Sequence, residues 1–246
     1  MRRFIMTTIR NNLQRVRERI STACAQAQRP VTDVTLLAVS KTFGPDAVRE
    51  AHAAGQLAFG ENYIQEGVEK IALLRELPLQ WHCVGPVQSN KTRLVATHFD
   101  WVHTIDRLKI AQRLSEQRPP ELVPLQVLIQ VNTDGGPTKA GVAPKEVLEL
   151  ARQVLLLPRL RLRGLMTIPE PAGDFASQRA LHLRAKLLLE QLNQAGLALD
   201  TLSMGMTGDL EAAIDAGSTM VRVGTAVFGG RPAKDATSSA PAAPAA

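Results

Sequence analysis

Apolar positions along the chain follow a helical spacing at first and then break into short, alternating segments. Ile9, Leu13, Val16 and Ile20 recur at helical intervals, and the Arg29-Pro30 pair ends this pattern. Short apolar runs typical of strands then alternate with amphipathic segments typical of helices. The predicted strands are 34–40, 56–61, 79–85, 101–106, 125–132, 160–168, 199–204 and 219–223. The predicted helices between them are 45–54, 64–77, 90–97, 107–117, 144–156, 175–195 and 209–216, with Asp209 as a candidate cap of the last.

Eight strands in strict alternation with helices indicate a parallel sheet that is buried on both faces. The number of strands and the chain length favour a single closed (β/α)8 barrel of the TIM type over an open doubly wound sheet. No Gly-rich G-x-G-x-x-G turn follows the first strand, which argues against a dinucleotide-binding fold. We predict one domain over residues 7–231, an extra N-terminal helix, and a disordered low-complexity tail over residues 232–246.

Composition and charge narrow the choice of partners and compartment. The chain has 246 residues, 45% of them hydrophobic, and a formal net charge of +6. Its arginines are scattered and do not alternate with aromatic residues, which disfavours nucleic-acid binding. Two distant cysteines fit a reducing compartment, and no apolar stretch has membrane-spanning length, so we predict a cytoplasmic protein without membrane contact. Either Met1 or Met6 is a plausible start.

The predicted strand ends carry the candidate chemistry, because barrels of this type place their sites at the C-terminal ends of the strands. The first strand, in "LLAVSKT", runs into Lys41. The seventh and eighth run into "SMGMTGD" and "RVGTAVFGG", where Ser203 and Thr225 offer hydroxyls and several glycines let backbone amides approach an anion. Loops after these two strands are the usual phosphate site of the fold.

Barrel closure brings the eighth strand beside the first, and therefore a bound phosphate beside Lys41. A buried lysine is costly unless it is paired or chemically used, and burial favours the neutral amine that attacks an aldehyde. Pyridoxal 5′-phosphate (PLP) carries both an aldehyde and a phosphate. Arg222 would then face the pyridine nitrogen of this cofactor.

Seven ordered motifs strengthen this interpretation through a family resemblance. "LLAVSKT", "FGENYIQE", "WHCVGPVQSNK", "HTIDR", "LPRLRLRGLMTIP", "TLSMGM" and "GSTMVRVGTAVFG" resemble the pyridoxal phosphate homeostasis protein family. The resemblance implies a barrel like the N-terminal domain of alanine racemases and a role in keeping PLP (vitamin B6) and amino-acid pools in balance, without an established catalytic activity. It implies these cofactor-binding residues: Lys41, Asn62, Ser203, Arg222, Gly224 and Thr225.

The roles of these residues also follow from the resemblance. Lys41 would hold PLP as a Schiff base, Asn62 would lie near the ring, and Arg222 would face the pyridine nitrogen. The remaining three would bind the phosphate. PLP-dependent apo-enzymes would be the recipients of the cofactor.

This sequence departs from the family pattern at three places. Phe43 stands where a second lysine is common, and "TKAG" at 138–141 replaces a serine-rich loop while keeping Lys139. Thr207-Gly208 replaces a serine followed by a polar residue, which would alter a phosphate contact.

Two other functions stay open at this point. One is a PLP-dependent enzyme, such as a slow amino-acid racemase or decarboxylase; a racemase needs two bases, and Tyr63 has packing as its expected role. The other is a phosphate-binding barrel in which Lys41 is only a charge. The histidines have no metal-ligand spacing, and we expect His98 and His103 to be ordinary surface or strand-end residues. A racemase dimerises through a further domain that we do not find, so we expect a monomer.

Overall fold

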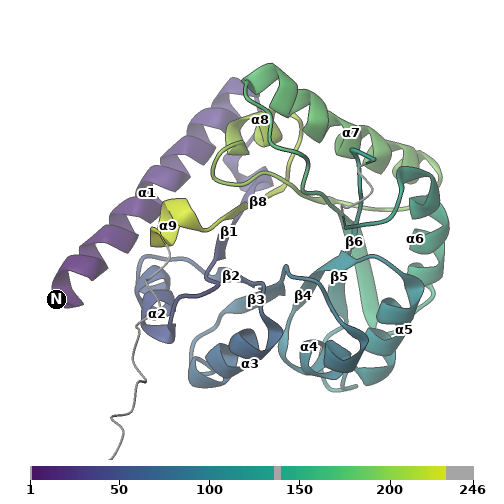
Figure 1. The fold of residues 1–246 in the computed structure, drawn as a ribbon, viewed down its shortest axis with the longest axis horizontal. Coiled ribbons are helices and arrows are strands. Elements are labelled where there is room, and N and C mark those ends of the chain that lie inside the picture. The colour runs from purple at the N-terminus through teal and green to yellow at the C-terminus, as the bar shows by residue number, and fades with distance from the viewer. Residues whose placement is uncertain (1, 136–139, 231–246) are drawn as a thin grey trace, which may run out of the picture.

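The strands of this protein form a closed parallel barrel, as the computed structural model in Figure 1 shows. The structure describes residues 2–135 and 140–230. The strands are β1 (Thr35–Val39), β2 (Ala58–Glu61), β3 (Gln80–Cys83), β4 (Trp101–Ile105), β5 (Leu125–Gln130), β6 (Leu160–Met166), β7 (Thr201–Ser203) and β8 (Met220–Val223). Each lies inside one of the predicted ranges, so the predicted fold class is confirmed. The predicted ranges are longer because the apolar runs continue beyond the paired residues.

The barrel closes through pairing of β1 with β8. Leu37 is in register with Arg222 and Ala38 with Val223. The first and last strands are therefore direct neighbours, as the sequence led us to expect, and the residues that follow them lie at the same end of the barrel.

Helices surround the barrel and cover the outer faces of the strands (Figure 1). They are α1 (Arg2–Gln26), α2 (Pro45–Ala53), α3 (Ile64–Leu73), α4 (Thr92–His98), α5 (Leu108–Gln117), α6 (Val147–Leu155), α7 (Phe175–Gln194), α8 (Leu210–Asp215) and α9 (Thr225–Phe228). The additional helix α1 lies outside the barrel and packs against α2, α8 and α9. Its buried residues include Leu13, Val16 and Ile20, three of the positions that predicted it.

Two layers of buried side chains hold the barrel together. Successive residues of a strand point to opposite sides, so the outward residues, such as Ala38 and Phe59, join the large core formed with the helices. Two smaller clusters fill the interior: one holds Leu37, Ala58, Val84 and Met220, and the other holds Trp101, Leu128 and Met166.

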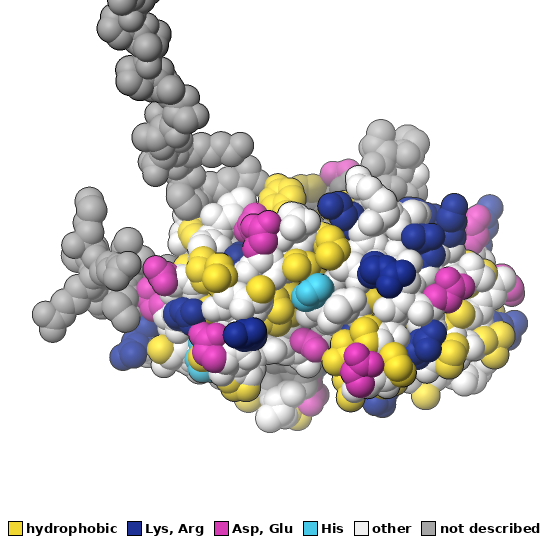
Figure 2. Space-filling view, turned by 90° about the horizontal axis from the view of Figure 1, so that it is seen from below, with side chains coloured by type: hydrophobic (Ala, Val, Ile, Leu, Met, Phe, Trp, Pro, Cys, Tyr) yellow, Lys and Arg dark blue, Asp and Glu magenta, His cyan; other side chains and the backbone are white. Residues whose placement is uncertain are grey.

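Charges are interspersed on the face shown in Figure 2, where Lys and Arg side chains lie among Asp and Glu side chains. No helix in the described part of the chain is long and apolar enough to span a membrane. The predicted tail, residues 232–246, and Lys139 of the "TKAG" segment lie outside the described residues.

Candidate functional site

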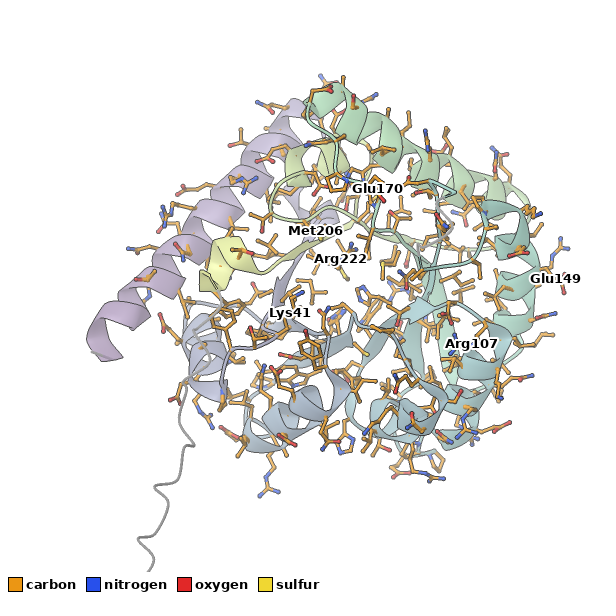
Figure 3. The ribbon with its side chains drawn as sticks, viewed as in Figure 1. Lys41, Arg107, Glu149, Glu170, Met206 and Arg222 are labelled. Atoms are coloured by element: carbon orange, nitrogen blue, oxygen red, sulfur yellow. The ribbon has the colours of Figure 1, made fainter. Side chains whose placement is uncertain are left out.

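A cavity of about 440 Å³ opens at the C-terminal end of the barrel. Figure 3 shows Lys41, Met206 and Arg222 near the centre of this end, whereas Arg107 and Glu149 lie at the periphery. The residues that line the cavity are Val39, Lys41, Thr42, Phe43, Asn62, Val84, Ile168, Met206, Thr207, Gly208, Arg222, Gly224, Thr225 and Gly229. Five of the six predicted binding residues are among them, and the sixth, Ser203, is not.

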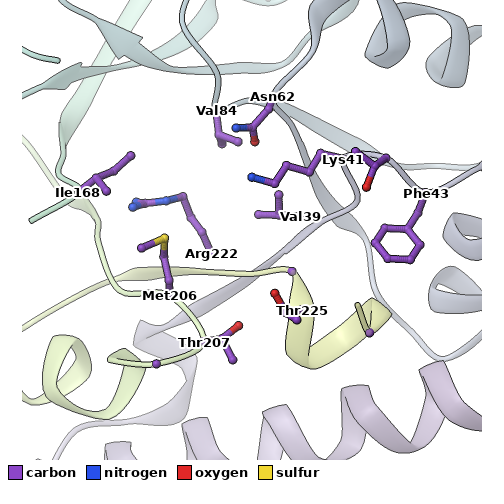
Figure 4. Close-up of a pocket in the computed structure, with 14 residues that line it drawn as sticks. Val39, Lys41, Phe43, Asn62, Val84, Ile168, Met206, Thr207, Arg222 and Thr225 are labelled. Carbon is purple, nitrogen blue, oxygen red and sulfur yellow. The ribbon is translucent and has the colours of Figure 1, made fainter. Parts of the chain in front are cut away.

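Lys41 enters the cavity from the turn that follows β1. Its side chain lines the cavity together with that of Val39, the last residue of β1. The side chain is half-buried rather than buried, so the fully buried lysine that the sequence suggested is not observed here. Figure 4 shows Lys41 extending into the cavity between Asn62 and Val39. Its ammonium makes no ion pair with any residue that the structure describes.

Two loops meet on the other side of the cavity, one after β7 and one after β8. Thr207 and Gly208 come from the first, and Gly224 and Thr225 from the second (Figure 4). The amides of Thr207 and Gly208 donate to no described residue, so they are available to an anion. The sequence predicts an anion-binding loop in "SMGMTGD", which contains Thr207 and Gly208, but does not name these two residues among the binding residues.

The loop after β7 is held from outside by charged side chains. Asp209 accepts a hydrogen bond from the amide of Met206 at 2.6 Å and lies 2.9 Å from Nε2 of His182. Arg19 of α1 donates to the carbonyl of Thr207 at 2.9 Å. Burial raises the pKa of Asp209, but the contacts with His182 and the Met206 amide outweigh it and lower the pKa overall. The expected cap is thus wrong in detail: Asp209 stands at the cap position of α8, but its carboxylate fixes the loop instead.

Arg222 lies at the floor of the cavity with its guanidinium buried. It donates to the carbonyl and hydroxyl oxygens of Ser203 at 2.6 and 2.8 Å, and to the carbonyl of Thr167 at 2.8 Å. Burial lowers the pKa of Arg222 to about 10, which leaves it charged at neutral pH. The guanidinium therefore presents a fixed positive charge to the cavity.

Ser203 lies below Arg222 and is fully buried, which does not agree with a phosphate contact. Its hydroxyl accepts from Arg222 and lies 3.0 Å from Nδ1 of His103. The contacts continue from His103 to His82 at 2.9 Å and from His82 to the side-chain oxygen of Gln80 at 3.0 Å. A single assignment of donors satisfies every contact. Arg222 donates to Ser203 and Ser203 to His103, while His103 donates to His82 and His82 to Gln80, with both imidazoles neutral.

The buried His82–His103 pair corrects the expectation that His103 is a surface or strand-end residue. Both rings are fully buried, and His82 stacks on Trp101 with ring centroids 5.2 Å apart. Burial lowers the pKa of His82 to about 3 and that of His103 well below its usual 6.5. Across residues 2–135 and 140–230, no three His, Cys, Asp or Glu side chains are grouped to bind a metal ion.

The neutral histidine pair is expected to make folding stability fall in mild acid. The unfolded chain takes up a proton on each histidine below about pH 6.5, whereas the folded chain does not until far lower pH. Each histidine therefore removes about 1.4 kcal/mol of unfolding free energy per pH unit below that value. Urea denaturation between pH 7 and pH 5 measures this slope, and His103→Asn should reduce it by one histidine's share. An unchanged slope in the variant would contradict the assignment.

Close packing fixes the positions of two further cavity residues, Asn62 and Phe43. A Cβ added to Gly85 would lie 2.0 Å from the carbonyl oxygen of Asn62, so the close approach that places Asn62 requires glycine there. Phe43, which stands in place of the second lysine, stacks on Phe228 of α9 with centroids 5.2 Å apart. Phe43 therefore links the Lys41 turn to the helix that follows the β8 loop.

Comparisons with known proteins agree with this geometry. The family model of the alanine racemase N-terminal domain matches residues 8–232. A pyridoxal phosphate homeostasis protein of Pseudomonas aeruginosa is 58% identical over 226 residues, covering 92% of this chain and 97% of that protein. One from Escherichia coli K12 is 53% identical over 229 residues, covering 92% and 98%.

Comparison with solved structures shows the same fold. PipY of Synechococcus elongatus, in a structure with PLP bound, superposes with a TM-score of 0.76 at 38% identity and covers 87% of this chain and 99% of its own. An alanine racemase of Clostridium difficile shares the fold, with a TM-score of 0.70 at 18% identity, covering 93% of this chain and 58% of its own.

Proposed function

This chain belongs to the family of pyridoxal phosphate homeostasis proteins, whose fold is that of the alanine racemase N-terminal domain, and from that premise we propose that it binds PLP through Lys41. In this proposal the protein holds the cofactor reversibly and contributes to PLP and amino-acid homeostasis without turning over a substrate.

One observation carries the proposal: an unpaired lysine, a buried arginine and two loops with available amides all face one cavity. The cavity, of about 440 Å³, has the size of a small-molecule site. Thr42 lines it with a buried hydroxyl that has no partner among the described residues. The donors, the charge and the volume therefore fit an anionic ligand that also carries an aldehyde.

Each residue has a separate task in this arrangement. Lys41 supplies the amine that condenses with the aldehyde, with release of one water. Thr207, Gly208, Gly224 and Thr225 would hold the phosphate, and we leave Ser203 out of this set because its hydroxyl serves Arg222. Bound PLP supplies an aldehyde that bonds reversibly to amines.

Two features favour a protein that holds the cofactor over an enzyme that turns over a substrate. Arg222 would face the pyridine nitrogen in this proposal, and its positive charge would keep that nitrogen unprotonated and weaken electron withdrawal by the ring. Among the cavity residues in the described ranges, Lys41 is the one amine that could serve as a catalytic base once it has lost its proton, whereas a racemase needs two bases. Tyr63 is half-exposed and does not line the cavity.

The test is an absorption spectrum of the purified protein with PLP, followed by borohydride reduction and peptide mass mapping. We expect a visible band and a reduced label on Lys41. A label spread over surface lysines, or no band, would sink the covalent assignment and leave a phosphate-binding barrel. Steady conversion of a free amino acid would favour the enzyme alternative.

Loosening the loop after β7 is expected to weaken phosphate binding. Asp209→Ala removes the acceptor of the Met206 amide and the contact with His182. We expect about tenfold weaker binding of pyridoxine 5′-phosphate, a ligand without the aldehyde, since a hydrogen bond to a charged group contributes about 1.5 kcal/mol or more. Calorimetric titration measures this. Asp215→Ala, at the other end of α8, is the control, and equal affinities in the two variants would refute the role of Asp209.

Location and partners are further parts of the proposal. Cys24 and Cys83 are buried free thiols, which supports a reducing, cytoplasmic compartment. A reversible link to Lys41 at an open barrel end supports transfer of PLP to recipient apo-enzymes. We propose in addition that the protein acts as a monomer.

A further inference from the structure

A cluster of buried charges lies beneath the turn that carries Lys41. Lys70 of α3 is 3% exposed, and its ammonium lies 2.6 Å from the carboxylate of Glu61 and 3.2 Å from that of Glu66. The Glu61 carboxylate is fully buried and the Glu66 side chain is 35% exposed. None of the three lines the cavity, so none has a direct contact with the proposed ligand site.

The contacts of this cluster fall on both sides of Lys41. The Lys70 ammonium donates to the carbonyl of Ser40 at 2.9 Å, and the Ser40 hydroxyl donates to Glu61 at 2.5 Å. On the other side, the amide of Thr42 donates to Glu66 at 2.8 Å. The residue before Lys41 and the residue after it are therefore tied to the same three charges.

The backbone at this turn needs such support. Thr42 has a φ of 68°, in the left-handed region that a β-branched residue rarely adopts. A strained residue of this kind persists only where surrounding contacts fix it. The bond from its amide to Glu66 is one of those contacts, and it forms where the chain turns away from Lys41.

Stability alone does not account for the cluster. Removing charges from water is unfavourable, and an apolar packing of similar volume is often as stable as a buried ion pair. Glu61 also keeps one buried carboxylate oxygen without a partner among the described residues. Among the described residues, the hydrogen bonds that the charged atoms of the cluster make outside it go to Ser40 and Thr42, the two neighbours of Lys41.

We propose that Lys70, Glu61 and Glu66 are positioning residues that hold the Lys41 turn so that its amine reaches a bound aldehyde. This inference rests on the proposed function and adds a consequence. The cluster should favour ligands that bond to Lys41, and it should not matter for ligands held by the phosphate loops alone, because preorganisation acts on the reacting amine.

Glu66→Ala tests the inference with two ligands. Glu66 is partly exposed, so its loss leaves the buried Lys70–Glu61 pair in place and the protein folded, which circular dichroism verifies. We expect affinity for PLP to fall about tenfold, as for loss of one hydrogen bond to a charged acceptor. We expect affinity for pyridoxine 5′-phosphate to stay within about twofold. Stopped-flow absorbance should show slower appearance of the visible band.

Two further variants sharpen the outcome. Glu66→Gln keeps an oxygen for the Thr42 amide and should restore most of the PLP affinity, while Glu69→Ala, exposed on the same helix, should behave as the unaltered protein. Equal loss for both ligands would show a merely structural role and overturn the inference, as would no loss for either. If the unaltered protein forms no visible band with PLP, the proposed function itself fails, and that result is seen before any variant is compared.

Discussion

Replacing Lys41 with alanine is expected to abolish the visible band that PLP forms with the protein and to remove the borohydride-reducible label. Affinity for PLP should fall about 100-fold, which corresponds to about 2.7 kcal/mol. The physical reason is that Lys41 is the one amine lining the cavity in the described part of the chain, so no other described lysine is placed to form the bond. Absorbance titration and mass mapping measure both effects.

The same variant should keep its affinity for pyridoxine 5′-phosphate within a few-fold, because the loops after β7 and β8 are unchanged. Lys41→Arg separates charge from chemistry: it retains the cation but forms no reducible bond. Lys109→Ala, exposed on α5, is the matched control. A visible band of normal intensity in Lys41→Ala would refute the assignment, and full PLP affinity in Lys41→Arg would mean that Lys41 serves only as a charge.

Replacing Lys70 with methionine is expected to lower the free energy of unfolding by about 3–5 kcal/mol at pH 7, because it leaves the Glu61 carboxylate buried without its cation. Burial already raises the pKa of Glu61 even though Lys70 opposes this shift. Without Lys70 the pKa rises further, above its value in the unfolded chain. The folded state then gains from protonation as the pH falls, so the loss of stability should be smaller at pH 5 than at pH 7.

Urea denaturation of the unaltered protein, Lys70→Met and the double variant Lys70→Met/Glu61→Gln tests this argument. The double variant removes both charges and should regain much of the lost stability. A double variant no more stable than the single one would show that Lys70 acts through its packing rather than through its charge.

The fold could be predicted from the sequence because each strand is a short apolar run between clear helical segments. Lys41 could be placed because a lysine directly after a buried strand has few ordinary explanations. The position of the two candidate phosphate loops beside Lys41 followed from strand order, since closure of the barrel puts β8 beside β1.

The interior of the site could not be predicted in the same way. Strands buried on both faces show no polar alternation, so "WHC" and "WVHTI" do not reveal that both histidines point inward. Ser203, which was predicted to bind the phosphate, does not line the cavity, because it is the last residue of the three-residue strand β7 and the loop begins beyond it. The sequence alone would place Lys70 on the exposed face of an amphipathic helix. Its burial depends on Gly67, where an added Cβ would lie 2.8 Å from Phe99, so that α3 approaches closely.

Helix α1 has a consequence for the order of events during synthesis. It packs on α8 and α9, with Asn12 donating to the carbonyl of Val227 at 3.0 Å and Arg19 to that of Thr207 at 2.9 Å. Segments that are synthesised early, α1 and β1, thus pack or pair with segments that are synthesised much later, α8, α9 and β8. A nascent chain carries Lys41 long before it has the loops after β7 and β8, so in the proposed function it would hold the phosphate of the cofactor only after both loops have been synthesised.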